Sequence, residues 1–98
     1  MELTSKQRAD LRSRANGIET ILFIGHEGVT DNVVKQADDA LTARELIKGR
    51  VLETAPLTAR EACEVLAART GAQGVQVIGS RFVLYRENPA NRKVFFRT

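Results

Sequence analysis

Residues 21–32 read Ile-Leu-Phe-Ile-Gly-His-Glu-Gly-Val-Thr-Asp-Asn, which indicates a strand, a Gly-x-x-Gly turn and the start of a helix. Either Thr30 or Asp31 is suited to cap that helix. Gly25 and Gly28 allow positive φ angles and a close approach of the backbone to a ligand. The unpaired N–H groups and the dipole of the helix attract an anion, which in a basic chain is expected to be a backbone phosphate. The other interpretation is an ordinary strand-to-helix turn.

The composition is that of one globular domain: 98 residues, 43% hydrophobic and 28% charged. The net charge is +3, and eleven of the fifteen basic residues are arginines, whose planar donor fork suits phosphates and stacks on bases. Most of these arginines are nevertheless expected to form a solvated surface. No run approaches the roughly 18 apolar residues of a membrane span, and the amino terminus lacks a signal-peptide core. We therefore expect no membrane partner and a cytoplasmic location.

The chain has one cysteine, Cys63, and one histidine, His26. One cysteine excludes an internal disulfide and any multi-cysteine metal site. A nucleophilic Cys–His pair requires a specific geometry and an orienting group, and nothing in the sequence indicates either. Cys63 is expected to be a small packing residue beside the apolar stripe of a helix. We therefore expect no catalytic residue, no metal site and no cofactor, and predict that the chain is not an enzyme.

Capping signals and periodicity predict the remaining elements. They are a helix from the Thr4/Gln7 capping box to Ala15, a helix over 31–44, a strand over 46–53, a helix from the Thr58/Glu61 capping box to Gly71, and strands over 75–78 and 82–85 joined at Gly79-Ser80. The order α-β-α-β-α-β-β indicates an α/β fold with a mixed four-stranded sheet.

Packing expectations follow from the apolar patterns. Because residues 21–24 are all apolar, their strand is expected to be covered on both faces, by helices two and three on one side and by the first helix on the other. Val65 is expected in the buried stripe of the third helix, beside Ala62 and Leu66. Gly49, inside the 46–53 strand, marks either a bulge or a close backbone approach.

Several segments, in this order along the chain, resemble the bacterial YhbY proteins, which are single-domain members of the CRM (chloroplast RNA splicing and ribosome maturation) family. They are Leu3–Arg8, Ile24–Thr30, Glu45–Lys48, Val75–Gly79 and Val83–Arg86. The resemblance implies an RNA-binding domain with a fold like the C-terminal domain of translation initiation factor three. It also implies a role with pre-50S ribosomal particles, where 23S rRNA would be the partner of a monomeric protein. The domain would span residues 1–87, followed by a basic C-terminal tail over 88–98.

The candidate RNA contacts fall into three groups. They are the Gly-x-x-Gly loop and the helix start (Gly25, His26, Glu27, Gly28, Thr30, Asn32, Lys35), the basic face of the first helix (Lys6, Arg8, Arg12), and the sheet with its hairpin turn (Lys48, Arg50, Arg81). The loop is the family's proposed RNA contact, by analogy with the backbone-clamping loop of KH domains.

The loop of this chain departs from the family pattern, because His26 and Glu27 stand where family loops usually carry Lys, Ser, Asn or Gly. A carboxylate close to a phosphate costs about 1 kcal/mol or more. Glu27 is therefore expected to point away, to cap the helix, or to weaken the loop so that the arginines supply the affinity. His26 is either an exposed turn residue or a partner for a base.

Two further alternatives concern the partner and the aromatic residues. The basic face would equally suit a protein-interaction adaptor that binds an acidic protein. Tyr85, Phe95 and Phe96 are the aromatic residues considered for base stacking, and packing in the core or tail is the preferred interpretation for all three.

Overall fold

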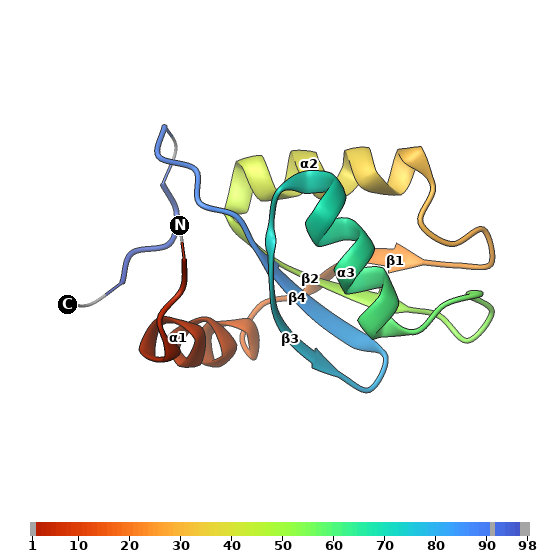
Figure 1. Cartoon of the computed structure of the whole chain (residues 1–98), viewed down its shortest axis with the longest axis horizontal. Coiled ribbons are helices and arrows are strands. Elements are labelled where there is room, and N and C mark those ends of the chain that lie inside the picture. Colours follow the sequence, from red (N-terminus) through yellow and green to blue (C-terminus); the bar gives the residue numbers. More distant parts are fainter. Residues whose placement is uncertain (1, 91, 97–98) are drawn as a thin grey trace.

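The computed structural model describes residues 2–90 and 92–96 and shows three helices and one four-stranded sheet (Figure 1). The elements are α1 (Ser5–Ala15), β1 (Thr20–Ile24), α2 (Asp31–Arg44), β2 (Leu46–Val51), α3 (Ala59–Thr70), β3 (Gln73–Ile78) and β4 (Arg81–Tyr85). The strand order is β1-β2-β4-β3, with β1 parallel to β2 and β4 antiparallel to both of its neighbours. The predicted element order and mixed sheet are confirmed. No helix of the described chain is long and apolar enough to cross a membrane.

The helices begin where their capping residues predict. Thr4 and Thr58 each accept a hydrogen bond from the backbone N–H of the third residue of their helix, and the side-chain oxygens of Gln7 and Glu61 accept one from the backbone N–H of the cap. These reciprocal bonds satisfy N–H groups that a helix cannot pair internally. At the other end of α3, Gly71 takes the left-handed conformation (φ 73°) that stops the helix.

α2 and α3 cover one face of the sheet and enclose the larger core, which includes Leu22, Leu41 and Leu66. At its centre Gly49 makes room for Phe82, since a Cβ on Gly49 would lie 2.3 Å from the ring carbon Cζ. β2 and β4 pair without a shift here, so Gly49 marks a close approach and not a bulge in this pair. Cys63 is buried in this core, as predicted, whereas Val65 is 40% exposed, because α3 turns Ala59, Ala62, Cys63 and Leu66 to the sheet instead.

The opposite face of the sheet corrects two expectations. α1 lies over β2 and β3 and not over β1, and its Leu11 and Ala15 pack with Leu46, Val75, Val83 and Tyr85. β1 is an edge strand whose side chains alternate between faces, so Leu22 and Ile24 enter the larger core while Phe23 points to the face that α1 leaves open. Phe23 is 51% exposed as a result, and the strand is covered on one face only.

The tail is held by Glu45, a fully buried residue between α2 and β2. Its carboxylate accepts backbone N–H bonds from Asn88 (2.6 Å), Lys93 (2.5 Å) and Val94 (2.7 Å). Burial by itself would raise the pKa of Glu45, but these donors and the nearby Arg92 outweigh it, so the pKa lies below its ordinary value. The charged form is therefore the one that the folded tail stabilises.

The tail completes the smaller core on the α1 side. Val94 is buried there, and the Phe96 ring meets Tyr85 edge-on at 5.9 Å between centroids. Arg14 of α1 lies 6.0 Å from the Phe96 centroid and donates a hydrogen bond to the Phe95 carbonyl oxygen. Packing is thus confirmed for Tyr85 and Phe96, while Phe95 is 64% exposed.

We predict that Glu45→Gln lowers the free energy of unfolding at pH 7 by about 1.5–3 kcal/mol, because three N–H groups lose a charged acceptor. Since the folded pKa is depressed, the contribution of the carboxylate is complete above the ordinary value of 4.5 and is lost as the pH falls through the lower folded value. Urea titrations at several pH values should therefore show the variant and the wild type converging below pH 4.5.

The matched control is Glu53→Gln, a charge removal at an exposed loop position, which should change stability by less than about 0.5 kcal/mol. Equal stability of Glu45→Gln and wild type at pH 7 would show that the carboxylate does not hold the tail.

Candidate nucleic-acid interface

The Gly-x-x-Gly loop joins β1 to α2 and closes with a hydrogen bond of 3.0 Å from the Gly28 N–H to the Gly25 carbonyl oxygen. Gly28 is buried at φ 71°, and a Cβ there would lie 3.4 Å from Pro56 Cγ. Gly25 does not have a positive φ and has open space around it. Only one of the two glycines therefore needs left-handed backbone freedom, and its close neighbour is the connection between β2 and α3.

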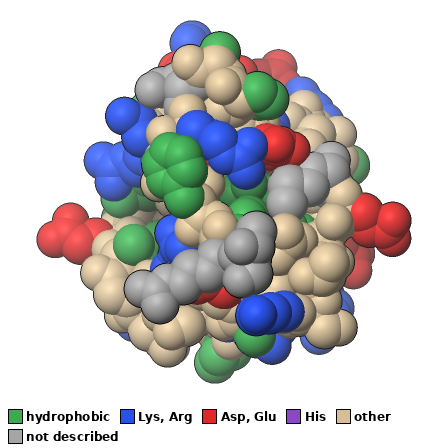
Figure 2. Space-filling view, turned by 90° about the vertical axis from the view of Figure 1, so that its left-hand side faces the viewer, with side chains coloured by type: hydrophobic (Ala, Val, Ile, Leu, Met, Phe, Trp, Pro, Cys, Tyr) green, Lys and Arg blue, Asp and Glu red, His purple; other side chains and the backbone are tan. Residues whose placement is uncertain are grey.

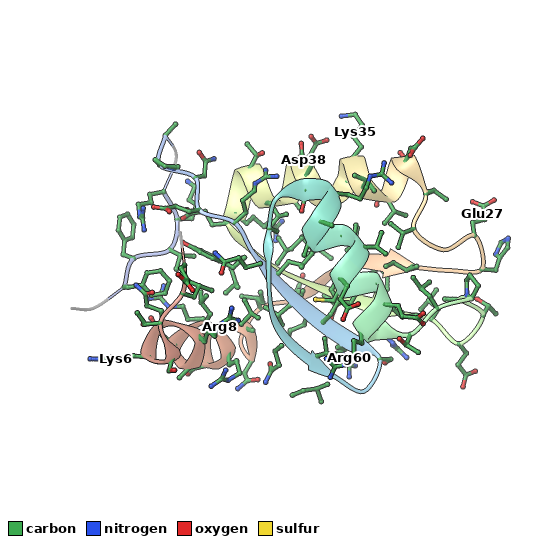
Figure 3. The ribbon with its side chains drawn as sticks, viewed as in Figure 1. Lys6, Arg8, Glu27, Lys35, Asp38 and Arg60 are labelled. Atoms are coloured by element: carbon green, nitrogen blue, oxygen red, sulfur yellow. The ribbon has the colours of Figure 1, made fainter. Side chains whose placement is uncertain are left out.

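His26 and Glu27, the two residues between the glycines, are both exposed. Glu27 projects outward from the tip of the loop (Figure 3) and forms no hydrogen bond or ion pair with the part of the chain that the structure describes. The cap of α2 is Thr30, whose Oγ1 accepts the Val33 N–H at 3.2 Å. Glu27 therefore does not cap the helix, and whether it points away from a bound phosphate or weakens the loop stays a prediction.

The charges at the start of α2 are paired with charges of the opposite sign. Asp31 in the first turn is almost fully exposed and forms an ion pair of 3.1 Å with Arg69 of α3, next to the exposed Asn32. One turn further on, Lys35 pairs with Asp39 at 3.1 Å on the outer side of the helix (Figure 3). The local field at this helix start is therefore mixed in sign.

The predicted basic face of α1 does not form a single surface. Arg8 is partly buried, and its Nη1 donates to the Gly74 carbonyl oxygen at 3.0 Å, which ties the helix to β3. Arg12 is exposed. Lys6 points outward at the end of the molecule opposite Glu27 (Figure 3), along a long axis of 42 Å. The structure therefore separates Lys6 from the loop.

Three of the predicted cations do lie together, namely Lys48, Arg50 and Arg81. They lie on the same face of the sheet as α1, in the part that α1 does not cover. Arg50 and Arg81 are direct cross-strand partners, and Lys48 lies two residues before Arg50 on the same face, opposite Val83. Lys48 and Arg81 share a hollow of about 190 Å³ with Asn16, at the end of α1. None of the three cations forms a hydrogen bond or ion pair with residues 2–90 or 92–96.

This cationic end of the sheet adjoins the Gly-x-x-Gly loop. Ile24, the last residue of β1, pairs with Val51, which follows Arg50 in β2. The Val51 N–H donates a hydrogen bond to the carbonyl oxygen of Ser80, which precedes Arg81 in the hairpin turn. Figure 1 shows the β1–α2 and β2–α3 connections at the same end of the molecule, opposite the termini. The loop and the three cations named above therefore form one region, which we call the loop end.

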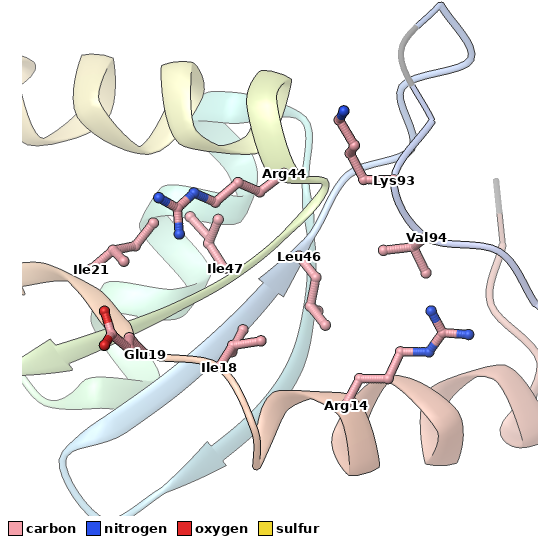
Figure 4. A pocket seen from close by; sticks show the side chains of 9 residues that line it. All are labelled: Arg14, Ile18, Glu19, Ile21, Arg44, Leu46, Ile47, Lys93 and Val94. Carbon is pink, nitrogen blue, oxygen red and sulfur yellow. The ribbon is translucent and has the colours of Figure 1, made fainter.

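A second group of cations lies away from the loop end and was not predicted from the sequence. Arg14, Arg44 and Lys93 line a hollow of about 250 Å³ with an apolar floor and the carboxylate of Glu19 (Figure 4). Arg14 is already paired with Asp10 at 3.1 Å. The view of the end with the tail shows both positive and negative side chains on this surface (Figure 2).

Two observations on the described residues concern metal binding and nucleophilic catalysis. They contain no group of three or more His, Cys, Asp or Glu side chains that could hold a metal ion. Burial, followed by the nearby Glu64, raises the pKa of the Cys63 thiol, which disfavours the thiolate that a nucleophile requires.

A small α/β domain with unpaired cations on an open sheet end beside a glycine loop has the features of a polyanion-binding module. Comparison with known proteins identifies the family to which this domain belongs. The model of the CRS1/YhbY (CRM) domain family matches residues 3–86, and the chain belongs to this family.

Two relatives match over most of their lengths. The chain is 41% identical to the Bacillus subtilis protein named "Probable RNA-binding protein YqeI" over 94% of this chain and 96% of the relative. It is 32% identical to a Haemophilus influenzae protein named "RNA-binding protein" over 86% of this chain and 85% of the relative. The solution structure of SAV1595 from Staphylococcus aureus superposes with a TM-score of 0.80 at 43% identity, covering 98% of this chain and all of the other.

Proposed function

We propose that this protein is a non-catalytic RNA-binding protein that contacts 23S rRNA in pre-50S particles during assembly of the large ribosomal subunit. The family and the names of its relatives support an RNA partner. The observation that carries the proposal is the set of three cations, Lys48, Arg50 and Arg81, that lie beside the Gly-x-x-Gly loop and have no ion-pair partner within residues 2–90 and 92–96. In this role the protein acts as a cytoplasmic monomer.

The charges of the loop end suggest a division of roles. Lys48, Arg50 and Arg81 have no carboxylate partner among the described residues, so their donors are available to phosphates. The loop itself carries Glu27 at its tip, and this carboxylate, which has no ion-pair partner among the described residues, repels a phosphate, whereas Asp31 behind it is paired with Arg69. The sheet cations therefore supply most of the affinity, and the loop backbone contributes less.

The assembly role predicts that the native protein co-sediments with large-subunit precursors on a sucrose gradient of cell extract. The expected peak lies with free pre-50S particles, because the exposed rRNA of an unfinished subunit is the proposed ligand. Absence of the protein from every ribosomal particle would contradict the assembly role.

The contact surface is tested by two variants that each remove two positive charges. Arg50→Gln/Arg81→Gln should weaken binding to a 23S rRNA fragment and flatten the slope of log K against log salt by about 1.5, since two phosphate contacts are lost. The control, Lys6→Gln/Lys93→Gln, removes two exposed cations outside the loop end and should leave the slope close to that of the wild type. Equal effects of the two double variants in fluorescence titrations would mean that the loop end is not the contact surface.

Glu27→Lys tests the loop separately. If the loop backbone lies near phosphate, replacing the repelling carboxylate by a cation should tighten RNA binding by about fivefold or more at low salt, from a change of roughly 1 kcal/mol or more. The control is Glu2→Lys, the same charge change at an exposed position outside the loop end. Unchanged affinity of Glu27→Lys in the titration would restrict the contact to the sheet cations.

A further inference from the structure

Four side chains form one row across the loop end of the sheet. Phe23 of β1 pairs with Arg50 of β2, Arg50 with Arg81 of β4, and Arg81 with Ile78 of β3. Residues that pair across neighbouring strands point to the same face, and three inter-strand spacings of about 4.8 Å make the row roughly 14 Å wide. Two arginines therefore stand side by side between two apolar residues.

All four members of this row are exposed. Phe23 is 51% exposed and Ile78 63% exposed, and both arginines are exposed as well. The row is not covered by α1. The sheet residues closest to the row that pack with α1 are Val83 and Val75. The adjacent row, with Leu22, Phe82 and Val77, points the other way into the larger core, so the alternation of the strands keeps Phe23 outside.

The charges of the row are unbalanced. Like charges directly opposite each other on antiparallel strands destabilise the pair, and neither Arg50 nor Arg81 has a carboxylate partner in the described chain. Glu53 lines a hollow with Arg50, but it does not form an ion pair with it. A polyanion that binds here would relieve this repulsion.

We propose that the Phe23 ring is a stacking platform for an unpaired base, and that the RNA segment on the loop end is therefore single-stranded. This inference rests on the proposed function and specifies its ligand. Phosphates of the strand contact Arg50 and Arg81, while one base lies on the ring of Phe23 at the edge of the sheet. No aromatic ring or guanidinium of the described residues stacks on Phe23, so its exposed surface is available.

Single-stranded RNA fits this row better than a duplex does. An aromatic ring beside cations is the arrangement that binds unstacked bases, and every base offers a flat surface for it. In an A-form duplex the base faces are stacked inside the helix, so a duplex would engage the arginines but gain nothing from the ring.

The test compares Phe23→Ala with Phe95→Ala. Phe95 is 64% exposed and lies on the tail side of the molecule, so it matches Phe23 in residue type and exposure but not in location. Each protein is titrated with a fluorescein-labelled oligoribonucleotide of 12 nucleotides of mixed sequence, alone and annealed to its complement. Phe23→Ala should weaken binding to the single strand by about fivefold or more, the expected loss for one stacked base, and should change duplex binding by less than about twofold. Phe95→Ala should change neither.

A second variant detects the stacking directly. The chain has no tryptophan, so Phe23→Trp introduces a single fluorophore at the proposed platform. The single strand should quench its emission, whereas the duplex and poly-glutamate should not. The amplitude of the quenching at saturating RNA does not depend on the affinity. Thermal unfolding of both Phe23 variants checks that they fold.

The outcomes separate the inference from the proposed function. If the wild type binds RNA in an Arg50/Arg81-dependent manner but Phe23→Ala binds the single strand as tightly as the wild type, stacking is overturned and the function stands. Quenching of Phe23→Trp by poly-glutamate as strong as by RNA would also overturn stacking, in favour of recognition of charge alone. If the wild type binds neither RNA at low salt, the proposed function fails first.

Discussion

The buried carboxylate of Glu45 is the interaction on which the α1 side of the molecule depends. Its backbone N–H ends α2 through a bond to the Leu41 carbonyl oxygen, and its own carbonyl oxygen accepts from Arg86 after β4. Its side chain then binds three N–H groups of the tail. Because one residue joins a helix end, a strand start and the tail, Val94 and Phe96 are brought over Tyr85 to close the smaller core.

The local parts of the fold could be predicted from sequence, since their causes lie within a few residues. Each capping box spans four positions, and the hairpin depends on Gly79-Ser80 and the strands beside it. The placement of α1 and the exposure of Phe23 could not be predicted in this way. They depend on the strand order β1-β2-β4-β3, in which β1 pairs on one side only, and nothing in residues 21–24 indicates that order.

The same distinction holds for the candidate site. The glycine loop was predicted from sequence, and of the two predicted candidates for the helix cap, Thr30 and Asp31, the structure has Thr30. The pairing of Lys35 with Asp39 has the i, i+4 spacing that could have indicated it, whereas Arg8 binds Gly74, 66 residues away, and no local pattern shows this. The cross-strand position of Arg50 and Arg81 likewise required the sheet register. The likeness to initiation factor three and the identity of the RNA stay predictions.

Cys63 gives the molecule a built-in reporter of its own opening. The thiol is buried under α3, so close to β3 that a Cβ on Gly74 would lie 3.0 Å from its sulfur. The side chain also lines a surface hollow of about 270 Å³ beside Arg60 and Glu64, and the chain contains no second cysteine to obscure the reaction with an alkylating reagent. The labelling rate of the natural protein therefore reports how readily a reagent enters between α3 and β3 at this hollow, and it rises with any opening of the larger core there.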